Sequence, residues 1–522
     1  MQPLPAGIQE FSIIREENHL YVDKTGYMLS IIRGSKYVFF SRPRRFGKSL
    51  LCSTLRCFYE GRQALFEGLY IYDKVDWVAI QRPVIHLDMN GVTIVEGDFG
   101  HNLDTYMDSL LALHGVTLSP DIKGSRGKLT ELIHTLAQRA GKRVAVIVDE
   151  YDKPLTEVLG NEEKFNYHRD ILRDFYSVFK SLDISLEKVF VTGVSKYGKT
   201  SIFSTLNNLT DISLNEEYAT MCGYTPEELE GYFGDYLAKT ALKFQKTIPE
   251  LLAEMRLRYN GYSFDGTTTV YNPYAVLCFF LAQKFKNFWF DTGTPYFLLK
   301  LLRQYKINYD TLEHIKAEIT ILDMADAVHQ SVIALLFQTG YLTIHEEITE
   351  DFDTYYKLGF PNIEVKQAFS QYVLAEYFVQ GTDFVLLDIA TPIRTAFRQH
   401  DIASVINIMQ NRVYPHVPYQ LYDTKEAYYH TIFHVTMNTI GFRTTSEVMT
   451  NIGRIDMIIE TYDTIFIFEF KLDESADVAI EQIKQKKYYQ KYLAYGYPIW
   501  AIGINFSTEK RNIVDYKMVE IG

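Results

Sequence analysis

The sequence lacks most features that mark a secreted or membrane-spanning protein. It has four cysteines in 522 residues and no C-x-x-C pair, which argues against a disulfide framework or a zinc ribbon and favours buried thiols in a reducing compartment. No run of about 18 apolar residues occurs, so we expect no membrane span. The first residues show no basic segment before an apolar core, so we expect no secretory signal and a cytoplasmic protein.

The chain also has no excess of positive charge, no internal repeat and no low-complexity tract. Its 53 Lys and Arg residues face 65 Asp and Glu, a net charge of −12, which excludes a surface coated in basic residues but not a local groove for a polyanion. Hydrophobic residues make up 47%, which is typical of a globular protein, and 522 residues exceed what a single core holds. We therefore expect several domains.

Three segments of different character divide the chain. Residues 1–215 alternate nearly continuous apolar runs with helical patterns, which predicts a parallel sheet covered by helices. Residues 216–385 are mostly helical, with a capping box at Thr225 and Glu228, and end in a helix–strand–strand–helix pattern that predicts a winged-helix-like unit. Residues 386–522 return to an α/β pattern. Its expected helices cover 425–440 and 476–494, and its expected strands cover 454–460, 464–471 and 498–506.

Two stretches compete as a phosphate-binding loop. "GVSKYGKT" (193–200) fits the pattern G-x-x-x-x-G-K-[ST] fully, whereas "RPRRFGKS" (42–49) has Arg42 in place of the first glycine. Such a loop needs a strand before it and a helix after it, because backbone N–H groups and a helix N-terminus converge on the phosphates. Its lysine reaches the β and γ oxygens and its hydroxyl ligates Mg²⁺.

Context favours the imperfect match. The strand "YVFF" (37–40) precedes it and an amphipathic helix with Gly61 at its end follows, whereas the Ser-, Thr- and Asn-rich segment after Lys199 competes with helix formation. The strand "VAVIVDE" (144–150) ends in an acidic pair typical of a Walker B element and lies after Lys48 but before Lys199. Pro43 removes one N–H donor from the favoured loop. Arg44 and Arg45 either add bonds to phosphate or are simply solvated.

At this point the chain resembles a known family. "YVDKT" (21–25), "SRPRRFGKSLL" (41–51), "VIVDEYDKPL" (146–155) and "TGVSK" (192–196) are similar to bacterial AAA-ATPase-like proteins with a C-terminal PD-(D/E)XK nuclease domain. "YNGYSF" (259–264) and "QTGYLTI" (338–344) extend the resemblance over nearly the whole chain, and arginine at the first loop position belongs to the family pattern. The resemblance implies an AAA-like P-loop NTPase domain over 1–215, a helical and winged-helix-like middle over 216–385, and a restriction-endonuclease-like domain over 386–522.

The resemblance also implies roles for individual residues. Lys48 and Ser49 would hold phosphate and Mg²⁺, Asp149 would support the metal, and Glu150 would polarise the attacking water. Thr192 or Ser195 would sense the γ-phosphate, although a strand-end hydroxyl such as Thr192 equally often bonds backbone. Asp23 and Lys24 are expected near the pocket without a defined role, and no arginine finger is assigned. The expected nucleotide-binding set is Arg44, Arg45, Phe46, Gly47, Lys48, Ser49, Leu50, Asp149, Thr192 and Ser195.

A second set of charged residues lies in "GRIDMIIETYDTIFIFEFK" (453–471). Residues i and i+2 of a strand face the same side, so Glu469 and Lys471 project together, and a hairpin would bring Asp456 beside them. Two carboxylates then hold Mg²⁺ against a scissile phosphate while the lysine orients or deprotonates water. A surface Glu-x-Lys ion pair is the alternative, but here apolar residues crowd both sides.

The order of motifs in PD-(D/E)XK nucleases adds a helix-borne Glu426 and Gln482 to this centre. Glu426 has the alternative of a first-turn helix charge, and Gln482 that of an exposed helix residue. The run "KQKKYYQKY" (484–492) interleaves lysines with tyrosines, which suits contacts to nucleic-acid backbone and bases. A solvated helix face is the alternative for this run, and it is the one that we favour.

Two functions follow from these patterns. The first is an enzyme that binds and hydrolyses ATP and uses Mg²⁺ to cleave DNA, with ATP gating or powering the cut. The second is a nucleotide-controlled switch or scaffold whose nuclease fold binds nucleic acid or protein without cleavage. Intact Asp456, Glu469 and Lys471 favour the first, and the altered phosphate loop favours slow turnover and hence the second. We expect nucleic acid, DNA foremost, and a second copy of the chain as partners, and no membrane.

Overall fold

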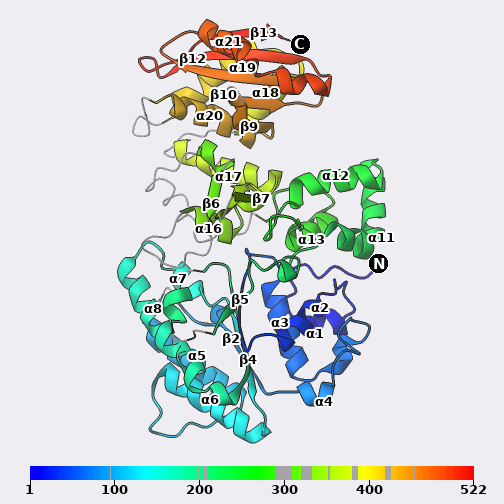
Figure 1. The fold of residues 1–522 in the computed structure, drawn as a ribbon, viewed down its shortest axis with the longest axis vertical. Coiled ribbons are helices and arrows are strands. Elements are labelled where there is room, and N and C mark those ends of the chain that lie inside the picture. The colour runs from blue at the N-terminus through cyan, green and yellow to red at the C-terminus, as the bar shows by residue number, and fades with distance from the viewer. Residues whose placement is uncertain are drawn as a thin grey trace. The chain divides into compact units, whose positions relative to one another are not determined.

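The computed structural model describes residues 1–521 except 95, 197–198, 205, 207, 290–308, 314, 319–331, 351–352, 379–385, 418–424 and 451–452. The chain forms two compact units, residues 1–298 with 316–362, and residues 299–315 with 363–522. Each unit has a sheet of its own (Figure 1). The three-domain division expected from the sequence stays a prediction. Within the described residues, no helix combines the length and the apolar character that a bilayer crossing requires.

The first sheet is parallel and has the strand order β2-β3-β4-β1-β5. Its strands are β1 (Tyr37–Ser41), β2 (Val84–Asp88), β3 (Val144–Asp149), β4 (Leu186–Gly193) and β5 (Thr210–Asp211). Every residue of β1 and β3 is buried, which explains why these strands appear as unbroken apolar runs. The order places β4 between the strand before the favoured loop and the strand with the acidic pair.

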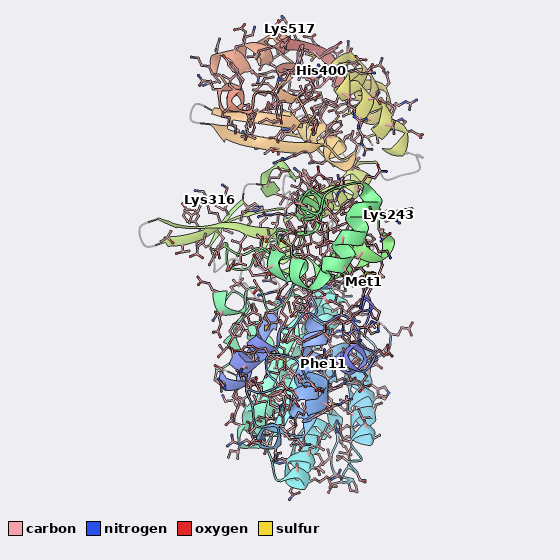
Figure 2. All side chains as sticks on the ribbon, turned by 90° about the vertical axis from the view of Figure 1, so that its right-hand side faces the viewer. Met1, Phe11, Lys243, Lys316, His400 and Lys517 are labelled. Atoms are coloured by element: carbon pink, nitrogen blue, oxygen red, sulfur yellow. The ribbon has the colours of Figure 1, made fainter. Side chains whose placement is uncertain are left out.

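Helices cover both faces of this sheet. Figure 1 shows α1 (Phe11–Glu16), α2 (Thr25–Arg33) and α3 (Lys48–Tyr59) on one side of the sheet, and α5 (Phe99–Leu113), α6 (Gly124–Ala140) and α8 (Glu162–Tyr176) on the other. Phe11, which Figure 2 labels, lies in α1, and its ring contacts those of Tyr21 and Phe66. The shorter helices are α4 (Trp77–Ile80), α7 (Lys153–Thr156), α9 (Val178–Ser181) and α10 (Lys199–Ile202).

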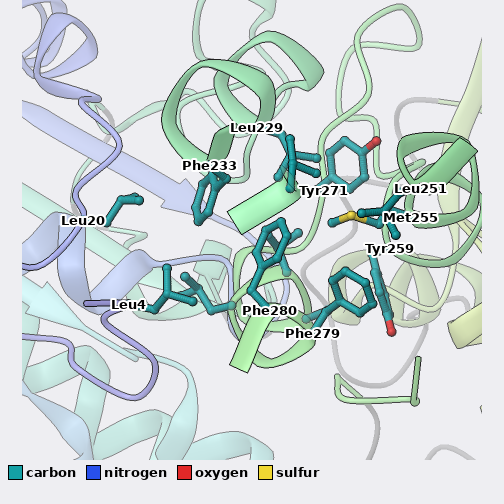
Figure 3. Packing of buried hydrophobic residues seen from close by; sticks show 14 of the residues in the cluster. Leu4, Leu20, Leu229, Phe233, Leu251, Met255, Tyr259, Tyr271, Phe279 and Phe280 are labelled. Atoms are coloured by element: carbon teal, nitrogen blue, oxygen red, sulfur yellow. The ribbon is translucent and has the colours of Figure 1, made fainter. Parts of the chain in front are cut away.

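A helical part follows in the same unit. It comprises α11 (Pro226–Phe244), α12 (Ile248–Tyr259) and α13 (Pro273–Ala282). Thr225 and Glu228 form the expected capping box at the start of α11. An apolar cluster joins these helices to the N-terminal segment, with Leu4 and Leu20 against Phe233 and Phe280 (Figure 3). The beginning of the chain is therefore part of this core.

The expected helix–strand–strand–helix order is present. The elements are α16 (Val332–Thr339), β7 (Thr343–Glu350), β8 (Asp353–Gly359) and α17 (Ile363–Phe378). β7 and β8 form an antiparallel hairpin, and β6 (Ile315–Glu318) pairs alongside β8. Because α17 belongs to the second unit, the winged-helix assignment stays a prediction.

The second unit contains a mixed sheet with the order β13-β12-β11-β10-β9. Its strands are β9 (Arg443–Thr450), β10 (Gly453–Glu460), β11 (Ile465–Leu472), β12 (Ile499–Ser507) and β13 (Asn512–Glu520). Its helices are α17, α18 (Leu386–Arg398), α19 (Ile402–Ile408), α20 (Glu426–Thr439) and α21 (Ala476–Gln485). β11 and β12 are parallel and α21 connects them, whereas the other neighbours are antiparallel.

One helix is shorter than the sequence suggested. The expected helix at 476–494 ends at Gln485, because Lys487 adopts a left-handed backbone (φ 47°) and stops the hydrogen-bonding pattern. Tyr488 and Tyr492 then turn inward into the apolar core of the second unit, while Lys484, Lys486 and Lys487 remain exposed. The lysines of this run are therefore solvated, as the favoured alternative expected, but the run does not form one helix face.

Candidate functional site

A cavity of about 580 Å³ lies at the carboxyl edge of the first sheet. The favoured loop, the segments after β3 and β4, the N-terminal segment and the later helices all contribute to its wall. Eight of the residues expected at the nucleotide line it, namely Arg44, Arg45, Gly47, Lys48, Ser49, Leu50, Glu150 and Ser195. The carboxyl edge of a parallel sheet is where ligands bind in α/β folds.

The favoured loop has the local geometry of a phosphate cradle. Gly47 has φ 92°, and nothing lies within 4 Å of a Cβ added there, so the backbone is bare where it enters α3. Lys48 is 5% exposed, and its Nζ donates to the carbonyls of Arg42 and Pro43, at 3.0 Å each. The lysine thus lies folded over the loop on neutral oxygens, which an incoming phosphate can replace as its partner.

Arg42, which stands where the general motif has its first glycine, has a structural role. Its side chain is 1% exposed, and the guanidinium donates to the carbonyls of Ser41, Ser213 and Tyr218 at 2.6–3.0 Å. It also lies 3.8 Å from the ring centroid of Phe264. Arg42 therefore points away from the cavity and fastens the base of the loop to the chain that follows β5.

The other loop residues tie the loop to the helical part of the unit. Phe46 does not line the cavity: it is buried and packs edge-on against Tyr262 and Phe264. Arg45, at φ 66°, lays its guanidinium 3.8 Å from the ring centroid of Tyr274. Arg44 is exposed, and its carbonyl accepts a hydrogen bond from the Trp289 indole at 3.1 Å. Sequence reasoning missed Tyr274, because an isolated tyrosine after a proline carries no motif.

The acidic pair lies beside the loop. Burial raises the pKa of Asp149 to about 6, against the lowering effects of a hydrogen bond from Ser49 and of the Lys48 charge. Glu150 has a left-handed backbone (φ 52°), donates its N–H to Asp149 at 3.0 Å and lines the cavity. A hydroxyl and a carboxylate in contact next to a phosphate cradle are the donors that suit Mg²⁺ beside a nucleotide, so the residues fit that pair of cofactors.

Thr192 and Ser195 differ at the end of β4. The Thr192 hydroxyl is fully buried and has no hydrogen-bond partner in the described part of the chain, and Thr192 is not among the described residues that line the cavity. The Ser195 hydroxyl donates to Asp152 at 2.7 Å, and the N–H groups of Val194 and Ser195 donate to the same carboxylate. Asp152 is buried and was missed, although it stands in the quoted stretch "VIVDEYDKPL".

The lysine of the second loop candidate forms an ion pair inside the protein. Lys199 forms an ion pair with Asp211 of β5, and Lys196 pairs with the same carboxylate at 2.9 Å. The helix that starts at Lys199 spans only Lys199–Ile202, and Lys199 is not among the described residues around the cavity. Gly198 lies outside the described residues. The pattern match at 193–200 therefore coincides with an internal ion pair.

Asp23 and Lys24 hold chain segments together. Asp23 accepts hydrogen bonds from the N–H groups of Thr25 and Tyr70 at 2.8 and 2.6 Å. Lys24 pairs with Glu228 of the α11 capping box at 2.5 Å. Neither is among the described residues that line the cavity. The contacts of "YVDKT" connect this segment to the residues around Tyr70 and to the start of α11.

The second centre is built on β10 and β11. Met457 pairs with Phe468 in the antiparallel register, so Asp456 stands across from Glu469. Asp456 accepts a hydrogen bond from the N–H of Phe470 at 2.8 Å, and Lys471 donates to Glu469 at 3.0 Å. Glu469 is 1% exposed and Asp456 9%. The structure thus brings the three expected residues together at one place in the sheet.

The electrostatics of this centre favour a bound cation. Burial, together with the charge of Asp456, raises the pKa of Glu469 to about 8, against the lowering effect of Lys471. One oxygen of Glu469, Oε2, is buried and accepts no hydrogen bond from the residues that the structure describes. Among the described residues no group of three His, Cys, Asp or Glu side chains is placed to hold a metal. Two carboxylates suffice for Mg²⁺, which keeps several waters, so the residues fit this ion.

Glu426 and Gln482 lie at the edge of the centre. Glu426 opens α20 and is exposed in part, yet partial burial and the charge of Asp456 raise its pKa while Lys471 lowers it. Gln482 is half-buried on α21, and its amide donates to the Tyr488 hydroxyl at 3.5 Å. The charges of Glu469 and Asp456 raise the pKa of Tyr488 in addition to its burial. Tyr488 is thus a neighbour of the centre that the motif order did not reveal.

A phosphate loop beside an acidic strand end defines the first unit as a P-loop nucleotide-binding fold, and an Asp and Glu-x-Lys on adjacent strands define the second as a nuclease-type fold. Residues 5–203 match the family model of a predicted AAA-ATPase, and residues 424–516 match that of the PD-(D/E)XK nuclease superfamily. The chain is 34% identical over 538 residues to an "Uncharacterized protein in vnfD 5'region" of Azotobacter chroococcum mcd 1, a match that covers 99% of each chain. The chain belongs to the family of AAA-ATPase-like proteins with a C-terminal PD-(D/E)XK nuclease domain, as the resemblance implied.

Proposed function

We propose that the protein binds and hydrolyses ATP in its first unit and cleaves DNA in its second, with Mg²⁺ at both centres and ATP gating or powering cleavage. The observation that carries the cleavage function is the buried Oε2 of Glu469, which accepts no hydrogen bond from the described residues, while Lys471 donates to the other oxygen of the same carboxyl group. An uncompensated carboxylate oxygen is costly inside a protein, and a bound cation removes that cost.

In the first centre, the loop N–H groups and Lys48 bind the β and γ phosphates, and Ser49 with Asp149 would hold Mg²⁺, which neutralises phosphate charge when bound. Glu150 orients a water and takes its proton as the water oxygen adds to the γ-phosphorus. The bond from that phosphorus to the bridging oxygen breaks, giving ADP and phosphate. The link from Asp152 to Ser195 keeps the ends of β3 and β4 in register for this step.

In the second centre, Asp456 and Glu469 would hold Mg²⁺, which stabilises charge on the scissile phosphate when bound. Lys471 positions a water for attack on the phosphorus and keeps its own ammonium near the developing negative charge. The phosphodiester bond to the leaving 3′ or 5′ oxygen breaks, and that oxygen takes up a proton. Glu426 and Gln482 contact the substrate or its waters from the edge.

A second candidate is a nucleotide-controlled switch whose nuclease fold binds without cutting. The specific observation in its favour is the loop itself, since Pro43 offers no N–H and Lys48 is bonded to loop carbonyls. A loop with fewer donors favours slow turnover, and slow turnover suits a switch.

Nucleotide binding by full-length variants tests the first centre. We expect Lys48→Ala to abolish binding of a fluorescent ATP analogue. Lys199→Ala should bind the analogue with an affinity within about twofold of wild type, because Lys199 forms an ion pair with Asp211. The reverse result would return the phosphate site to residues 193–200.

Cleavage of supercoiled plasmid and single-stranded DNA, with Mg²⁺ and with or without ATP, tests the second centre. We expect Glu469→Gln to lose cleavage by at least about 100-fold, because the metal loses a ligand. Glu481→Gln, an exposed position on α21, is the matched control and should cleave as wild type does. DNA binding without cleavage by wild type would favour the switch.

A further inference from the structure

Lys153 is a second cation of the nucleotide cavity that no motif singled out. It is the first residue of α7, and its N–H donates to the carbonyl of Glu150 at 3.0 Å. It lines the same cavity as Lys48, Ser49 and Glu150. We propose that Lys153 contacts the γ-phosphate of an ATP molecule bound in its own chain, and that it does so on the side of Glu150 away from the loop. This inference rests on the proposed nucleotide function.

The bonding of the Lys153 ammonium supports this role. Its Nζ donates to the side-chain oxygen of Asn90, a neutral group just after β2, at 2.6 Å. No carboxylate of the described residues lies within 4 Å of this ammonium, although Glu157 lines the same cavity four residues on. By contrast, Lys24, Lys128 and Lys199 each form an ion pair. The charge of Lys153, like that of Lys48, is therefore held in place without being neutralised.

The position of Lys153 follows from the strand order. β2, β3, β4 and β1 are neighbours in one parallel sheet, so Asn90, Lys153, Ser195 and the loop all emerge at its carboxyl edge. A triphosphate that begins at the loop, on β1, extends its γ-phosphate toward the β3 end, where Glu150 and Lys153 stand. The loop and Lys48 hold the β-phosphate and one side of the γ-phosphate, and Lys153 meets the γ-phosphate from the other side. A contact from Lys153 thus distinguishes ATP from ADP.

Such a cation acts on the phosphate that carries the developing charge. Cations aimed at the transferring phosphoryl group stabilise its charge in both the bound state and the transition state. Asn90 orients the side chain through a neutral oxygen and leaves the remaining ammonium protons for the phosphate. Each chain then supplies its own positively charged side chain to the γ-phosphate, and does not depend on a neighbouring copy for one.

The test compares the affinities of the full chain for a non-hydrolysable ATP analogue and for ADP, by calorimetry with Mg²⁺. We expect Lys153→Met and Lys153→Gln to weaken the ATP analogue by about tenfold and ADP by less than about twofold, because only the analogue has the lost contact. Lys153→Arg should restore most of the preference. Lys142→Met is the control, since Lys142 also bonds only to neutral carbonyls but lies outside the cavity.

The outcomes separate this inference from the proposed function. If wild type binds neither nucleotide, the proposed nucleotide site is wrong and the inference falls with it. If wild type binds both, and the folded Met or Gln variant keeps the wild-type preference for the ATP analogue, Lys153 does not contact the γ-phosphate. Equal weakening of both nucleotides would also overturn the assignment, because it would place Lys153 on the phosphates that they share.

Discussion

At the residue scale, Arg42 shows how a side chain replaces a motif glycine. We expect Arg42→Met to lower the free energy of unfolding by about 3 kcal/mol, because buried carbonyls of Ser41, Ser213 and Tyr218 lose their donor. Arg42→Gly, which restores the general motif, should destabilise the protein in the same way. Urea unfolding measures both variants.

The control for this prediction is Arg126→Met. Arg126 forms an exposed ion pair with Asp174 at 3.1 Å, which contributes about 1 kcal/mol or less. If Arg42→Gly were as stable as wild type, the interpretation of Arg42 as the anchor of the loop would be wrong.

Asp211 makes the stability of the first unit depend on pH. Burial alone would raise the pKa of Asp211, but Lys196 and Lys199 hold it well below its usual range. A depressed carboxyl pKa adds stability above the unfolded pKa of about 3.9, and that stability is lost as the pH falls below it. We expect the stability difference between wild type and Asp211→Asn to be constant from pH 7 to 5.5. At pH 3.5 it should be smaller by about 0.5 kcal/mol. A difference that grows on acidification would contradict the ion-pair account.

At the element scale, β3 and β4 are joined by close packing. A Cβ on Gly193 would lie 2.4 Å from Oδ1 of Asp152 and 2.7 Å from the Tyr151 ring. We therefore expect Gly193→Ala to lower the unfolding free energy by about 1–3 kcal/mol and to slow ATP hydrolysis, because the strand ends must separate. Thermal unfolding and phosphate release measure the two effects.

Gly231→Ala is the matched control within the same unit. Gly231 lies in α11 with nothing within 4 Å of an added Cβ, so alanine there should stabilise the helix by about 1 kcal/mol or less. If Gly193→Ala were as stable and active as Gly231→Ala, the contact between the ends of β3 and β4 would have room for the added methyl group, and the prediction would be wrong.

The buried strands and their ends were predicted well from the sequence, whereas the edge strands β5, β9 and β13 were not expected. β1, β3 and β4 are buried on both faces and so form continuous apolar runs, and the β10–β11 hairpin follows from the alternation around Glu469. The end of α21 was not predictable, because Lys487 adopts a left-handed backbone without being a glycine or an asparagine. The tyrosines that follow α21 resembled a nucleic-acid-binding surface in the sequence, because periodicity does not reveal the turn that buries Tyr488 and Tyr492.

Within the sites, residues in motifs were predictable and their supports were not. Lys48, Ser49 and Glu150 have fixed spacings to a strand or a helix. Asp152 and Lys153, by contrast, form hydrogen bonds with residues that follow other strands, Ser195 after β4 and Asn90 after β2. Such pairings depend on the strand order, which places β4 beside β3 and which local patterns do not encode.

At the scale of the whole molecule, each unit contains one of the two proposed phosphate-handling centres, and the proposed function couples them. We expect ATP to change the rate of plasmid cleavage by wild type and by Lys199→Ala, whereas Lys48→Ala should cleave at one rate with or without ATP, because it no longer binds the nucleotide. Nicking assays over a range of ATP concentrations measure this. An ATP response retained by Lys48→Ala would show that the nucleotide acts elsewhere.

The central claim is that two separate centres in one chain act on phosphate esters. Phosphate release and plasmid nicking, measured side by side on Lys471→Ala, test it most directly. We predict no nicking by this variant and ATP hydrolysis at the wild-type rate, because Lys471 belongs only to the second centre. Nicking at the wild-type rate by Lys471→Ala would contradict the account.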